Sequence, residues 1–147
     1  ALPPLATAAI LPRLASFCND HAIITDVASV KGNVVEAVEK LPADFSSRFV
    51  PGHPIAGSEK SGYLASNAGL FAKRNIILTP LANNSSDSLR LVSAMWRALD
   101  ANMLAMSVKH HDEVLAATSH LPHLLAYSIV DVLAKQEKSG DSKNGFL

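Results

Sequence analysis

Up to about residue 107 the chain alternates between two hydrophobic patterns. Short runs of apolar and β-branched residues, each bounded by turn residues, predict strands at 21–27, 48–54, 75–80 and 101–107. Apolar residues recurring at helical spacing predict helices at 5–18, 33–41 and 85–100. Strands separated by helices are typical of an α/β fold with a mainly parallel sheet and helices on both faces.

The helix at 85–100 has the clearest amphipathic pattern, and a serine or aspartate stands at its start as a possible N-cap. Leu91, Met95, Trp96 and Leu99 recur at helical spacing, which assigns them to the core. At the other end of this region, Pro12 strains the helix at 5–18. Cys18 closes that helix as a small core residue.

The pattern changes at residue 108. Residues 110–137 predict one long helix or two, apolar nearly all round between Val114 and Leu133. A helix of this kind is buried on most sides, so it needs a partner subunit or further sequence to cover it. Pro122 removes one backbone donor and predicts a kink near Thr118. The chain therefore divides into residues 1–107 and a helical part at 108–147, which ends in a polar, frayed tail.

Composition narrows the classes of partner. The 147 residues include 13 basic and 13 acidic side chains with no basic patch, which argues against nucleic acid as a partner. No apolar run reaches the roughly 20 residues that span a bilayer, so no membrane partner is expected. The single cysteine permits no internal disulfide, and no secretion signal precedes it, so a cytoplasmic location is expected.

The polar segments follow predicted strand ends, where ligands bind in open α/β sheets. Ser29 follows the first strand. Its hydroxyl suits either a ligand contact or a cap on the next helix, whose free amides would favour an anion. His53 stands at the carboxyl end of the second strand, where a general base is expected, and Ser58, Glu59 and Lys60 follow it in the glycine-rich loop. These neighbouring polar residues favour a functional loop over an ordinary surface loop that happens to contain a histidine.

A third polar group lies inside the apolar helix, at residues 118–123. His120 and His123 share one helix face, and buried histidines need partners. Binding or orienting an anion at a domain seam is the favoured interpretation, with structural histidines as the alternative. A metal site that includes His110 and His111 has less support, because no carboxylate or cysteine stands at a recognised metal spacing.

Three segments in this order and spacing, residues 26–32, 49–62 and 111–127, resemble the prephenate and arogenate dehydrogenase family of tyrosine biosynthesis, as does the stretch at 70–80. The resemblance implies a partial Rossmann-type domain followed by the start of a helical dimerisation domain, and a homodimer. It also implies oxidative decarboxylation of prephenate or arogenate, with NAD or NADP as cofactor.

The resemblance assigns roles to individual residues. His53 matches the catalytic histidine that helps deprotonate the ring hydroxyl, and Ser29 matches the serine beside that histidine, the substrate hydroxyl and the nicotinamide. The positions that match the substrate pocket are Ser58, Glu59, Ser119, His120 and His123.

The chain also departs from the family pattern. It lacks the Gly-x-Gly-x-x-Gly turn, the acidic residue for the ribose and the arginine that clamps a substrate carboxylate, and Ala28 stands where the family usually has glycine. We therefore expect the middle of an enzyme, weakly active by itself. Two other classes stay open: a non-catalytic binding or regulatory module that keeps the pocket, and a metal-dependent hydrolase that uses the histidines of 110–123.

Overall fold

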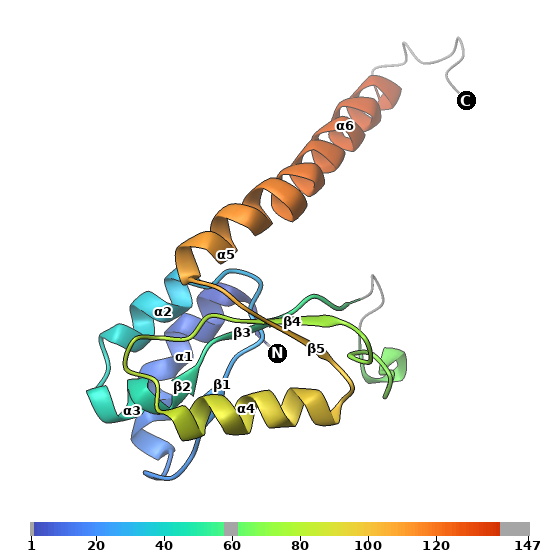
Figure 1. The fold of residues 1–147 in the computed structure, drawn as a ribbon. Coiled ribbons are helices and arrows are strands. Elements are labelled where there is room, and N and C mark those ends of the chain that lie inside the picture. Colours follow the sequence, from blue (N-terminus) through green and yellow to red (C-terminus); the bar gives the residue numbers. More distant parts are fainter. Residues whose placement is uncertain (1, 58–61, 139–147) are drawn as a thin grey trace. The chain divides into compact units, whose positions relative to one another are not determined.

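A computed structural model describes residues 2–57 and 62–138 (Figure 1). The chain forms two compact units, residues 1–112 and 113–147. The helices of the first unit are α1 (Pro4–Phe17), α2 (Gly32–Glu39), α3 (Ala43–Arg48) and α4 (Ser86–Ala98). Its strands are β1 (Ile24–Thr25), β2 (Phe49–Val50), β3 (Gly52–Pro54), β4 (Asn75–Leu78) and β5 (Asn102–Ala105). Helix α5 (Val108–Leu115) runs into the second unit, which continues as α6 (Leu121–Lys138).

The strands form two small sheets that confirm the predicted α/β fold with parallel pairing. Strand β1 pairs parallel with β2, and β4 pairs parallel with β5. Strand β3 instead runs antiparallel to β4, with His53 opposite Ile77. In its described part, the connection from β3 to β4 contains one short 3-10 turn, Tyr63–Ala65. Parallel strands are usually joined by a helical crossover, and the described part of this connection contains no helix beyond that short turn.

The segment predicted as one strand at 48–54 has a different structure. Helix α3 ends at Arg48, and the strand is split at Pro51 into β2 and β3, which belong to different sheets. Proline has no backbone N–H for a sheet ladder. The Pro51 carbonyl instead accepts a hydrogen bond from the Thr79 N–H at 3.0 Å. The predicted strand at 21–27 is likewise reduced to Ile24–Thr25.

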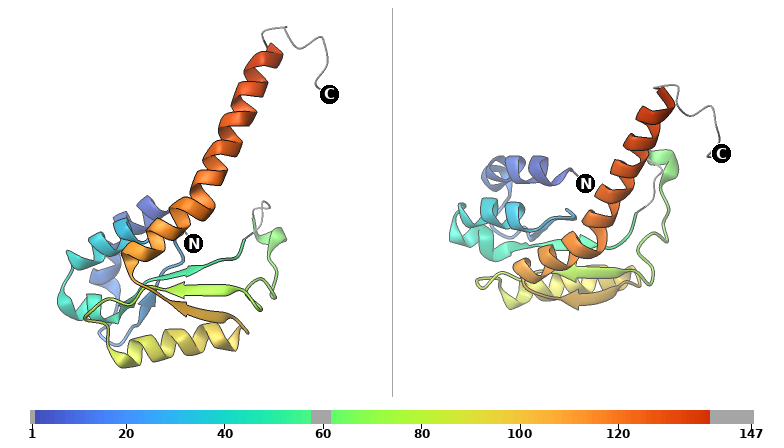
Figure 2. Two further views of the ribbon diagram at one scale, coloured as in Figure 1. Left: turned by 45° about the horizontal axis from the view of Figure 1, so that its top comes forward. Right: turned by 90° about the horizontal axis from the view of Figure 1, so that it is seen from above.

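Two apolar clusters hold the first unit together. One joins helices α1, α2 and α3 through Leu11, Val34, Val38, Phe45 and Phe49. The other lies between the β3–β4–β5 sheet and helix α4, which runs along one face of that sheet (Figure 2). The position of the carboxyl end of β1 is therefore fixed by packed elements on both sides.

Helix α4 confirms the predicted helix and its N-cap, because the Ser85 Oγ accepts the Ser88 N–H at 3.0 Å. The core assignment is correct for Trp96, which is 4% exposed, and wrong for Leu91, Met95 and Leu99, which are 43–52% exposed. The buried stripe is Ser88, Val92 and Trp96, at spacings of one turn. The three exposed residues lie on the neighbouring face. Cys18, also assigned to the core, is only half-buried.

The helical part contains a π-helical turn, Ala116–His120, between α5 and α6. The Leu121 N–H donates to the Ala116 carbonyl, and Pro122 has no N–H to offer. The irregularity therefore coincides with the site of the predicted kink, and π turns of this kind are frequent at functional sites. None of the helices in the described part of the chain combines the length and apolarity needed to cross a bilayer.

Candidate active site

A buried ion pair joins the carboxyl end of β1 to the start of β3. The Lys31 ammonium, fully buried, pairs with Asp26 and also donates to the Gly52 carbonyl at 2.6 Å. Asp26 accepts the backbone N–H groups of Ala28 at 3.0 Å and Gly52 at 3.1 Å. Burial lowers the pKa of Lys31, and the attraction of Asp26 opposes this shift. The network fixes the backbone on either side of the candidate catalytic residues.

His53 lies within strand β3 and is 9% exposed. Pairing with β4 continues through Pro54, which stands opposite Ile76, so His53 is part of the sheet and not of the loop that follows. A side chain carried by a strand has a better-defined position than one carried by a loop. The structure therefore gives this histidine the fixed surroundings that a catalytic base requires.

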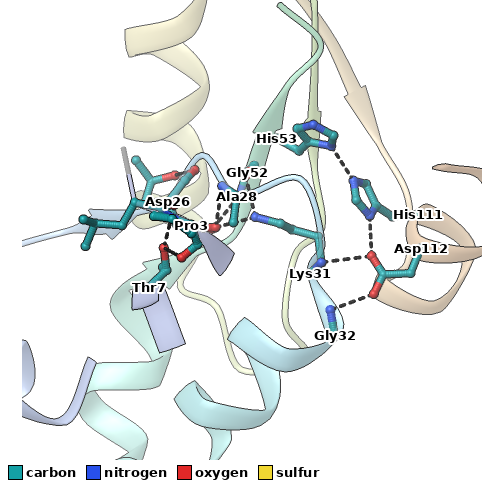
Figure 3. Close-up of polar contacts among 12 residues, drawn as sticks. Pro3, Thr7, Asp26, Ala28, Lys31, Gly32, Gly52, His53, His111 and Asp112 are labelled. Carbon is teal, nitrogen blue, oxygen red and sulfur yellow. Dashed lines mark hydrogen bonds and ion pairs between the residues drawn. The ribbon is translucent and has the colours of Figure 1, made fainter. Parts of the chain in front are cut away.

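His53 begins a chain of polar contacts that crosses to helix α5 (Figure 3). Its Nδ1 lies 2.9 Å from Nε2 of His111, and the two rings meet edge to face with centroids 5.1 Å apart. His111 is fully buried, and its Nδ1 lies 2.7 Å from Oδ1 of Asp112. Two imidazoles and a carboxylate are thus connected in series.

Asp112 in turn caps helix α2. Its Oδ1 accepts the Lys31 N–H at 2.9 Å and its Oδ2 accepts the Gly32 N–H at 2.7 Å. Burial would raise the pKa of Asp112, but the hydrogen bonds from Lys31, His111 and Gly32 outweigh it and hold that pKa below its usual value. A Cβ at Gly32 would lie 2.9 Å from Oδ2, so a side chain there would push the carboxylate away.

This cap corrects the prediction for the start of that helix. The amides expected to favour an anionic ligand hold an internal carboxylate instead. Ser29 is not the cap either: it is exposed in the loop after β1, and its hydroxyl makes no hydrogen bond within the described residues. The hydroxyl therefore stays available for a ligand.

The other predicted site residues fall into two groups. Ser58 and Glu59, with Lys60, lie outside the described residues. Ser119, His120 and His123 belong to the second unit, in and just after the π turn. There, Nδ1–H of His123 donates to the Ser119 carbonyl at 2.8 Å. His120 lines a surface groove of about 600 Å³ together with Glu113, Ala116, Ala117, Leu121 and Leu124.

No support emerges for the metal-dependent hydrolase. Across residues 2–57 and 62–138, no three histidine, cysteine, aspartate or glutamate side chains lie close enough to hold a metal ion. Of the histidines proposed as ligands, His111 is engaged by His53 and Asp112.

Sequence reasoning gave no site role to Asp26, Lys31 or Asp112 and considered His111 only as a metal ligand. One signal for His111 was present: it precedes the buried Leu115 by four residues, so a helix places both on the same inward face. A histidine at a core-facing position needs a polar partner. The identity of that partner depends on contacts across the fold.

Comparison with known proteins matches both parts of the chain to one family. The profile described as "Prephenate dehydrogenase, nucleotide-binding domain" matches residues 1–105, and the one described as "Prephenate dehydrogenase, dimerization domain" matches residues 107–145. The cyclohexadienyl dehydrogenase of Zymomonas mobilis is 35% identical over 93% of this chain and 46% of its own length. The prephenate dehydrogenase of Bacillus subtilis is 36% identical over 88% of this chain and 35% of its own length.

Solved structures give the same result. Prephenate dehydrogenase from Aquifex aeolicus, in complex with hydroxyphenyl propionate and NAD+, superposes with a TM-score of 0.84 at 36% identity, covering 91% of this chain and 46% of that one. Arogenate dehydrogenase from Synechocystis gives a TM-score of 0.73 at 27% identity, covering 93% of this chain and 46% of that one. The chain spans half or less of the length of these relatives. With both family domains matched in order along it, the chain belongs to the prephenate dehydrogenase family.

Proposed function

We propose that the protein carrying this chain oxidises prephenate or arogenate, with NAD or NADP as cofactor, in tyrosine biosynthesis. The observation that carries the proposal is the buried His53 on β3, hydrogen-bonded to His111 and fixed beside the carboxyl end of β1. The named activities of the relatives support the substrate class.

The reaction removes a hydride from the ring carbinol carbon and a proton from its hydroxyl, and then releases carbon dioxide to leave an aromatic ring. His53 accepts the hydroxyl proton, which lowers the barrier because hydride departure makes that hydroxyl strongly acidic. Ser29, exposed next to the same strand end, orients the hydroxyl and the nicotinamide. Buried Ala28 and the Asp26–Lys31 pair fix the loop that carries this serine.

The chain's residues fit one end of a dinucleotide cofactor. NAD or NADP supplies the acceptor for the hydride. The exposed Ser29 hydroxyl beyond a parallel strand suits the nicotinamide end, since ligands of such sheets bind there. The glycine-rich turn that would hold the pyrophosphate has no counterpart in this sequence.

The substrate residues are assigned by the resemblance. It matches Ser58, Glu59, Ser119, His120 and His123 to substrate-binding positions of the family. In the second unit, the bond from Nδ1 of His123 to the Ser119 carbonyl fixes the ring of this exposed histidine. When protonated at Nε2, such a ring donates a charge-assisted hydrogen bond to a carboxylate, which suits a dicarboxylate substrate.

Turnover tests the proposal. The full-length protein should reduce NAD+ or NADP+ when supplied with prephenate or arogenate, followed by the absorbance of the reduced nicotinamide. The four combinations of substrate and cofactor identify the pair in use. Binding of either substrate without reduction of either cofactor would contradict the proposal and favour a binding module.

We also propose that the protein is a homodimer formed through the helical domain. Helix α6 exposes apolar side chains on every face, with Leu125, Ile129 and Val130 each 55–63% exposed, and the dimerization-domain profile covers this helix. Ile129→Asp should therefore shift the protein from dimer to monomer, measured by light scattering after gel filtration. Ala94→Asp, at an exposed position of α4, is the matched control. A dimer that survives both Ile129→Asp and Leu125→Asp would argue against this interface.

A further inference from the structure

The contact between His53 and His111 indicates which nitrogen of His53 carries a proton. Asp112 already accepts the N–H groups of Lys31 and Gly32, and an ionised carboxylate can only accept, so Nδ1 of His111 must carry the hydrogen that joins the two side chains at 2.7 Å. A neutral imidazole has one N–H, which leaves Nε2 of His111 as an acceptor. The nitrogen 2.9 Å away, Nδ1 of His53, must then be the donor.

We propose that His111 and Asp112 are positioning residues that hold His53 in its Nδ1–H tautomer and so leave Nε2 as the proton acceptor. This inference rests on the proposed function for its catalytic meaning, but the tautomer itself is a property of the fold. An imidazole accepts a proton only at its unprotonated nitrogen, so the wrong tautomer inactivates a base that is otherwise correctly placed.

The anchor of this chain is the start of helix α2. The amides of Lys31 and Gly32 both donate to the Asp112 carboxylate, so its orientation is set by backbone. The carboxylate also stabilises positive charge on the two rings once His53 has accepted the substrate proton. The O–H bond of the substrate breaks, the proton passes to Nε2 of His53, and the electron pair stays on the oxygen.

Two substitutions at His111 separate its hydrogen bonds. In His111→Asn the shorter amide occupies the region of Nδ1, where it still donates to Asp112 but presents no acceptor to His53. In His111→Gln the amide reaches the region of Nε2, where its oxygen accepts from His53. Both replacements are polar and smaller than histidine, so a purely structural role for His111 predicts similar damage from both.

Tautomers are read directly by two-bond proton–nitrogen correlation spectra of the neutral histidine rings in 15N-labelled full-length protein. The His53 signals are assigned by their loss in His53→Gln. We expect the Nδ1–H form in the wild type, its loss in His111→Asn and its return in His111→Gln. In the same series kcat should fall about 100-fold in His111→Asn, with little change in KM, and recover largely in His111→Gln.

The outcomes separate the two proposals. An Nε2–H tautomer of His53 in the wild type, or an imidazolium at His111, would overturn the inference. So would an unchanged tautomer in His111→Asn when circular dichroism shows that the variant is folded. If the wild type turns over neither substrate, the proposed function fails, and the spectra still decide the tautomer.

Discussion

Replacing Lys31 with methionine should lower the free energy of unfolding by about 3–5 kcal/mol, which is the usual cost of removing one partner from a buried ion pair. The Lys31 side chain has no exposed surface, and that of Asp26 is 5% exposed. Without the ammonium, Asp26 would keep the backbone N–H donors of Ala28 and Gly52 but would have lost its charged partner. Urea unfolding at neutral pH measures the difference, provided that the slope against urea is unchanged.

Lys40→Met is the matched control, because Lys40 also pairs with a carboxylate. Its partner is Glu36, and both side chains are about 70% exposed. Solvent-exposed pairs of this kind contribute little to stability, so the loss should be far smaller than in Lys31→Met. Equal losses in the two variants would contradict the assignment of Lys31 to the buried network. Adding Asp26→Asn to Lys31→Met should recover part of the loss, because it removes the unpaired charge.

Replacing His53 with alanine should lower kcat by about 100- to 10,000-fold, the range associated with general-base assistance. KM should change little, because the proton moves in the transition state rather than on binding. The measurement is steady-state turnover of the preferred substrate by the full-length protein, with thermal unfolding as the check on folding.

His21→Ala serves as the control, since His21 is exposed and its side chain makes no hydrogen bond within the described residues, while its backbone N–H donates to Oδ1 of Asn19. It should retain wild-type turnover. If His53→Ala kept the wild-type kcat, another group would have to be the general base. The proposal would then lose its central residue.

Short-range sequence signals predicted the helices that are stabilised by interactions between residues close in sequence. The Ser85 cap and the one-turn spacing of apolar residues defined helix α4. The same pattern did not say which neighbouring stripe faces inward, because Leu91 and Met95 are as apolar as Val92. That choice depends on which face meets the sheet, and only the fold supplies this information. Pro51 was visible in the sequence, but its effect of dividing one strand between two sheets depends on the Thr79 contact.

The candidate site was likewise predicted only in part from the sequence. The resemblance of three segments identified the family and led to the proposal of His53 and Ser29 as catalytic residues. The residues that hold His53 in place were missed because their contacts join distant parts of the chain: His53 and His111 are 58 positions apart, and Lys31 and Asp112 are 81 apart. Hydrophobic periodicity carries no information on such pairs.

The cap that Asp112 places on helix α2 has a consequence for biosynthesis. At about 5–20 residues per second, the ribosome adds Asp112 roughly 4–16 s after Lys31. Throughout that interval the start of α2 lacks its capping side chain, although its apolar partners on α1 and α3 are already made or follow soon. The nascent chain therefore completes its first apolar cluster before it completes this helix start. Because the same carboxylate contacts His111, the surroundings of His53 are finished in the same late step.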